Sequence, residues 1–182
     1  MIDRLVAALE RNRCVVHRVR PDDVGPLVTE RACSLGAGDR RPLAWADHPT
    51  LTRLRVADAL ADAGVPLLRG DDPTWRARLP DAPVGLTGAD LAAAEEGVLA
   101  IPGGPGAPRA VSLVPPAHLC VVEAGAVVER VADAVTLLAR RRDRSPTVLV
   151  GGPSRTGDLE MRPTFGVHGP VRVEVVVVEP EA

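Results

Sequence analysis

Residues 42–68, PLAWADHPTLTRLRVADALADAGVPLL, contain one complete strand–helix–strand unit. The apolar run at 42–46 predicts a buried strand, and residues 65–68 predict a second one. Between them, Thr50 is a candidate N-cap for a helix that continues through Ala63 and stops at Gly64. Because helical crossovers join parallel strands, this unit predicts an α/β fold with a mostly parallel sheet.

The same alternation continues outward in both directions. We expect helices at residues 2–12, 22–35 and 126–140, and strands at 14–19, 83–87, 98–101, 118–122, 147–150 and 171–178. The third helix should bury Val127, Val131, Val135 and Leu138, and the arginines at its end complement the helix dipole. Neither an internal repeat nor a linker interrupts the pattern, so residues 1–182 are expected to form one domain, with a helix at 1–12 and the motifs in the half at 84–178.

Composition narrows the function classes. The formal net charge is only −2 and aromatic residues make up 2% of the chain, which disfavours a nucleic-acid surface. All 22 basic residues are arginine, and the missing lysine excludes Schiff-base, pyridoxal-phosphate and P-loop chemistry. The three cysteines are scattered and form no C-x-x-C pair, and no apolar run is long enough to span a membrane. A cytoplasmic protein without its own metal cluster is therefore expected.

Two polar blocks follow predicted strands in the middle of the chain. In the first, Thr87, Gly88 and Asp90 are candidates for ligand binding, with a sharp turn at Gly88 and with Asp90 and Glu95 as candidate proton-transfer groups. Spacing alone favours the other interpretation, in which Asp90 is a helix cap and Glu95 and Glu96 are solvated surface groups. In the second, the loop at 102–108, PGGPGAP, is either a turn or an anion-binding nest. Arg109 and Ser112 follow it as candidate ligand contacts.

Two further blocks lie in the second half. His118 opens a predicted strand and is a candidate proton donor, although a buried structural histidine is commoner. Candidate contacts for an anionic ligand lie after the strand at 147–150: Ser154, Arg155, Thr156, Asp158, Glu160 and His168. The side chains of Asp158, Glu160 and His168 offer oxygen and nitrogen atoms that could bind a metal ion. Their spacing matches no metal motif, so no metal is predicted.

The order of these blocks carries a resemblance. TGADLAAAEEG, SLVPPAHLCVV, GGPSRTGDLEM and FGVHGP, which span about residues 84–178, resemble successive signatures of the LUD domain family of lactate-utilization proteins. The resemblance implies a Rossmann-like three-layer sandwich similar to the sugar-phosphate isomerase and CoA-transferase superfamily. One departure concerns Glu96 and Val98, where the family usually has threonines.

The resemblance also implies a function. The chain would be the non-cluster subunit of a system that oxidises L-lactate to pyruvate, binding a small anionic ligand while iron–sulfur partner proteins carry the redox cofactors. Two alternatives stay open. One is a stand-alone CoA-transferase or sugar-phosphate isomerase with Glu95 or Glu96 as nucleophile, or with Asp90 or Glu95 as base. The other is a non-catalytic module that binds a small carboxylate.

Overall fold

The structure is a computed structural model that describes residues 1–141, 146–157, 163–165 and 168–180. Its helices are α1 (Ile2–Arg11), α2 (Val24–Ser34), α3 (Pro49–Arg53), α4 (Val56–Asp62), α5 (Trp75–Arg78) and α6 (Val131–Ala139). Its strands are β1 (Val15–Val19), β2 (Leu43–Trp45), β3 (Leu67–Leu68), β4 (Val84–Gly88), β5 (Leu91–Ala93), β6 (Val98–Pro102), β7 (Ala117–Glu123), β8 (Val127–Val128), β9 (Thr147–Val150), β10 (Arg155–Gly157), β11 (Pro163–Phe165) and β12 (Arg172–Val178). Among the described helices, none has the length and apolar character needed to cross a membrane.

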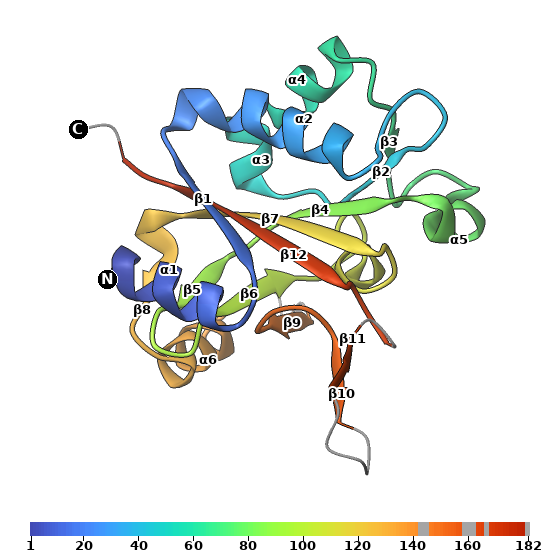
Figure 1. Cartoon of the computed structure of the whole chain (residues 1–182). Coiled ribbons are helices and arrows are strands. Elements are labelled where there is room, and N and C mark those ends of the chain that lie inside the picture. Colours follow the sequence, from blue (N-terminus) through green and yellow to red (C-terminus); the bar gives the residue numbers. More distant parts are fainter. Residues whose placement is uncertain (142–145, 158–162, 166–167, 181–182) are drawn as a thin grey trace.

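A six-stranded sheet with the order β1-β12-β7-β4-β2-β3 forms the centre of the molecule. Every adjacent pair in it is parallel, as the strand–helix–strand pattern predicted. A second sheet, β8-β5-β6-β9, contains antiparallel pairs, and β10 and β11 form a separate hairpin that projects from the body (Figure 1). The predicted α/β class with a mixed, mostly parallel arrangement is thus confirmed.

The sheets and helices form layers (Figure 1). Helices α2, α3 and α4 cover one face of the central sheet, and their apolar residues pack on alternate residues of the central strands such as Leu86, Leu119 and Val176. The opposite face, with Cys120 and Val175, packs against α1 and the second sheet. Both faces of the central strands are therefore buried, which explains their nearly continuous apolar sequences.

The predicted helix at 50–63 is wrong in one respect, because the structure divides it into α3 and α4. Arg55 adopts a left-handed conformation with φ 52° between the two helices. The cap is also two residues earlier than predicted. The His48 side chain, not that of Thr50, accepts the capping hydrogen bond, which comes from the backbone N–H of Thr50. His48 is thereby fixed at the start of α3.

The predicted helix at 126–140 is also wrong in its bounds and its buried face. Residues 127–128 form β8, and α6 begins only at Val131. Within α6 only Ala134 is buried, while Val135 is 49% exposed. The apolar spacing correctly predicted a helix here, but it predicted the wrong buried face. In the structure α6 packs on β5 and β8 of the second sheet, and Ala134 is its buried residue.

The connections after β2 and β4 leave in opposite directions. From β2 the chain passes through α3 and α4 to β3, on one side of β2 in the sheet. From β4 it passes through the second sheet to β7, on the other side. Such a topological switch point opens a crevice at the carboxyl ends of two parallel strands, where open α/β sheets characteristically bind ligands.

Candidate functional site

A cleft of about 600 Å³ lies at this switch point, and we call it the switch-point cleft. Asp47 and His48 reach it directly after β2, and Asp90 reaches it directly after β4. Arg141, just after α6, and the loop at 102–107 complete its wall. The chain thus brings four segments to one opening, and three of them contribute charged or titratable side chains.

His48 is held in one orientation by two hydrogen bonds. The backbone N–H of Thr50 donates to Nδ1 at 3.2 Å, so Nδ1 is an acceptor and carries no proton. Nε2 therefore carries the proton and donates to Oδ1 of Asp90 at 3.0 Å. With both nitrogens engaged and 6% of the side chain exposed, His48 positions Asp90 instead of acting as a free base.

Asp90 lies between two donors. Its Oδ1 accepts from His48, and its Oδ2 accepts from the Arg141 guanidinium at 2.6 Å. Burial acts to raise the pKa of Asp90, but the hydrogen bonds from His48 and Arg141 and their charges outweigh it, so the pKa lies below the ordinary value. Asp90 is thus ionised at neutral pH, which makes it a good hydrogen-bond acceptor and a weak base.

Gly88 serves a different purpose from the one predicted. It stays within β4 and has no positive φ, so the expected sharp turn at this position is wrong. A Cβ at Gly88 would lie 2.2 Å from Cγ and Nδ1 of His48. The glycine is required because the imidazole ring lies directly against the backbone of β4.

The glycine-rich loop forms a wall of the cleft by turning on itself. The N–H groups of Gly104 and Ala107 donate to each other's carbonyl oxygens at 2.9 and 3.2 Å, and Gly103 donates to Pro146. Gly106 approaches Asp47 so closely that a Cβ would lie 2.5 Å from its carboxylate. Because three loop amides already have partners, the geometry favours the turn interpretation over an anion nest.

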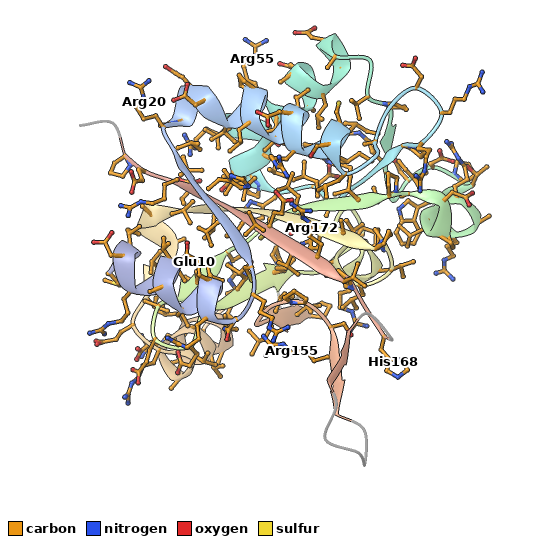
Figure 2. The ribbon with its side chains drawn as sticks, in the orientation of Figure 1. Glu10, Arg20, Arg55, Arg155, His168 and Arg172 are labelled. Carbon is orange, nitrogen blue, oxygen red and sulfur yellow. The ribbon has the colours of Figure 1, made fainter. Side chains whose placement is uncertain are left out.

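Three of the predicted ligand contacts gather at a second place. Ser112, Ser154 and His168 line a hollow of about 210 Å³ beside β9, which we call the hairpin-base groove. Arg155 and His168 lie at the base of the projecting hairpin, with His168 exposed (Figure 2). Ser112 donates its hydroxyl to the carbonyl of Arg109 at 3.0 Å, and Arg109 itself is exposed.

Thr87 and His118 lie inside the molecule. Thr87 Oγ1 and His118 Nε2 are 2.9 Å apart, and both side chains are buried between the two sheets. Burial lowers the pKa of His118 to about 4, so the ring is neutral. Neither residue lines the switch-point cleft or the hairpin-base groove.

Glu95 and Glu96 belong to the surface around α6. Glu95 forms a two-pronged ion pair with Arg130 at 2.6 and 3.1 Å, and the hydrogen bonds from Arg130 lower its pKa. Glu96 accepts a hydrogen bond from the backbone N–H of Val131 at the start of α6.

Arg155, which was predicted to bind an anionic ligand, instead donates a hydrogen bond to the backbone carbonyl of Asn12.

The remaining predicted ligand contacts are Thr156, Asp158 and Glu160. Asp158 and Glu160 lie outside the described residues. Thr156 pairs with Thr164 in the β10–β11 hairpin.

His48 was not among the residues predicted from the sequence, and Arg141 was predicted only as one of the arginines that complement the dipole of the helix at 126–140. A signal for His48 was present, because Asp47 and His48 follow a buried apolar run just as Asp90 follows the next predicted strand. No comparable signal marks Arg141, which reaches Asp90 across 51 residues of sequence.

Comparisons with known proteins agree with this fold. Lactate utilization protein C from Deinococcus radiodurans is 36% identical over 117 residues, 63% of this chain and 55% of that protein. The protein of the same name from Halalkalibacterium halodurans is 35% identical over 103 residues, 54% of this chain and 45% of that protein. The chain thus matches about half the length of these curated relatives.

A crystal structure of a DUF162 family protein from Deinococcus radiodurans has the same fold. The two structures superpose with a TM-score of 0.73, over 97% of this chain and 95% of that one, at 24% sequence identity. The family model of the LUD domain matches residues 2–178. This chain therefore belongs to the LUD domain family.

Proposed function

We propose that this chain is a subunit of a lactate-utilization system and binds a small anionic ligand, with L-lactate as the first candidate, in the switch-point cleft. The observation that carries the binding site is the group His48–Asp90–Arg141 at the carboxyl ends of β2 and β4. The names of the relatives support the process, since proteins that are 36% and 35% identical to parts of this chain are lactate utilization proteins C.

In this proposal, iron–sulfur partner proteins take the two electrons that leave lactate when it becomes pyruvate. The cysteines of this chain support that division. Cys14, Cys33 and Cys120 are far apart in the sequence and form no C-x-x-C pair, the spacing that cluster-binding motifs use, and Cys14 and Cys120 are buried. This chain then contributes ligand binding and assembly with its partners.

A genetic complementation experiment tests the role in lactate utilization. A strain that lacks this gene should grow on glucose but not on L-lactate, and the wild-type gene should restore growth. Asp90→Asn should fail to restore it, while Glu95→Gln is the matched control, because Glu95 pairs with Arg130 away from the cleft. Normal growth of the deletion strain on L-lactate would overturn the proposed role.

A biochemical experiment tests the proposed partners. Affinity purification of the tagged chain from lactate-grown cells should recover proteins that carry iron–sulfur clusters, identified by their absorbance and iron content. Recovery of the chain alone, under conditions in which the cells oxidise lactate, would contradict the proposed assembly.

A further inference from the structure

The hydrogen bonds of Asp90 leave acceptor capacity on the side of the cleft. An ionised carboxylate has about four acceptor positions, two on each oxygen. Within the described part of the chain, His48 fills one position on Oδ1 and Arg141 fills one on Oδ2. The Asp90 side chain is 13% exposed and lines the cleft. A ligand there meets a fixed carboxylate that has room for further donors.

The orientation of this carboxylate is set before any ligand arrives. The imidazole of His48 is held by the N–H of Thr50 on one side and by Asp90 on the other, and it packs against the backbone of Gly88. Since Nε2 can only donate in this tautomer, it favours an acceptor partner and keeps Asp90 in its ionised form. His48 is thus a positioning residue for Asp90.

An ionised, fixed carboxylate discriminates between ligands by their hydrogen-bond donors. A hydroxyl group can donate to Asp90, whereas a keto group can only accept and would place its oxygen against a carboxylate oxygen. Arg141, which is paired with the other oxygen of Asp90, also lines the cleft, and a guanidinium is a group that recognises carboxylates. The two groups together fit a molecule with a hydroxyl next to a carboxylate.

We propose that Asp90, positioned by His48, makes the switch-point cleft selective for 2-hydroxy carboxylates over the matching 2-keto carboxylates. This inference rests on the proposed function, which requires a small carboxylate in the cleft. A site that hydrogen-bonds a ligand hydroxyl rejects analogues without it strongly, and for this open cleft we expect a preference of about tenfold or more.

Calorimetric titration of the whole chain with L-lactate and with pyruvate tests the proposal. We expect the wild-type chain to bind L-lactate more tightly than pyruvate, by a factor of about ten or more. Asp90→Asn should bring the ratio of the two affinities close to one, because an amide can also donate to a keto oxygen. His48→Leu should lower the ratio, and His48→Gln should restore most of it, because its amide can still donate to Asp90.

The possible outcomes separate the two proposals. Equal binding of L-lactate and pyruvate by the wild-type chain would overturn the selectivity while leaving a carboxylate-binding cleft in place. Failure of both ligands to bind would overturn the cleft as the ligand site and with it this inference. Unfolding midpoints show whether His48→Leu folds. If it does not, the ratio of L-lactate to pyruvate affinity of the wild-type chain decides whether the cleft is selective.

Discussion

Two histidine–carboxylate–arginine groups lie at different places on the central sheet. At the carboxyl end, His48 contacts Asp90 at 3.0 Å and Arg141 contacts the same carboxylate at 2.6 Å. Within the sheet, His17 of β1 contacts Glu174 of β12 at 3.0 Å, and Arg31 of α2 contacts the same carboxylate at 2.9 Å. The chemistry of the two groups is the same, so their difference must come from their surroundings.

The difference is the number of acceptor positions that the protein itself fills. Glu174 is fully buried and accepts two hydrogen bonds from Arg31, one from His17 and one from Arg172, which uses all four positions. Asp90 lines the cleft and accepts one on each oxygen from described residues. A saturated carboxylate stabilises the fold, and an unsaturated one next to a cleft is suited to bind a ligand.

The largest predicted effect is on the free energy of unfolding, and it should differ between substitutions of Arg31 and Arg141. Arg31→Leu should lower the free energy of unfolding by about 2–3 kcal/mol, because it leaves Glu174 buried with fewer donors. Arg141→Leu is the matched control and should cost less than about 1 kcal/mol, because the Arg141 side chain is 36% exposed. Urea denaturation at pH 7 measures both values.

A comparable loss in both variants would break this comparison. It would mean that the cleft group contributes to the fold as strongly as the buried group. In that case the exposure of Asp90 to the cleft would not distinguish a binding carboxylate from a structural one.

The second prediction concerns His118, which is buried and has no carboxylate partner in the described structure. Its pKa is about 4 in the folded chain and 6.5 as the ordinary value, so folding keeps it neutral. Its contribution to stability is present above pH 6.5 and is lost as the pH falls toward 4, by about 2 kcal/mol between pH 7 and pH 5. Urea denaturation of the wild type and of His118→Asn at both pH values measures this difference.

In His118→Asn this part of the pH dependence should disappear, whatever the absolute stability of the variant. His168→Gln is a suitable control, because His168 is exposed. An unchanged slope in His118→Asn would show that His118 is not the group responsible, and the distinction from the carboxylate-paired histidines would fail.

The smallest predicted effect concerns Glu95. Its ion pair with Arg130 is at the surface, where solvent screening leaves such pairs little effect on stability. Glu95→Gln should therefore change neither L-lactate affinity nor the unfolding midpoint appreciably. A tenfold loss of affinity would show that Glu95 acts in the ligand site, as the sequence hypothesis of a catalytic carboxylate requires.

The sequence predicted the central sheet well, because its strands are short apolar runs bounded by glycine, proline or charge. It predicted the helices less accurately, because tertiary contacts determine where a helix ends and which of its faces is buried. The left-handed Arg55 divides one helix, and α6 exposes Val135 although its apolar spacing indicates burial. These features depend on neighbours distant in sequence, which local periodicity does not encode.

The candidate site shows the same division. Asp90 was predicted from its place after a strand, and the structure puts it on the cleft. Its partners His48 and Arg141 come from positions 42 and 51 residues away, and only the fold brings them together. Ser112, Ser154 and His168 were also predicted to contact a ligand, and the structure places them in the hairpin-base groove, whose lining does not include Asp90.

The central claim, that Asp90 is the ligand-binding carboxylate of this chain, is tested most directly by a crystal structure grown with saturating L-lactate. We expect lactate in the switch-point cleft, with its hydroxyl within hydrogen-bond distance of Asp90 and with His48 still donating to Oδ1. Lactate bound only in the hairpin-base groove, or an empty cleft at saturation, would contradict it.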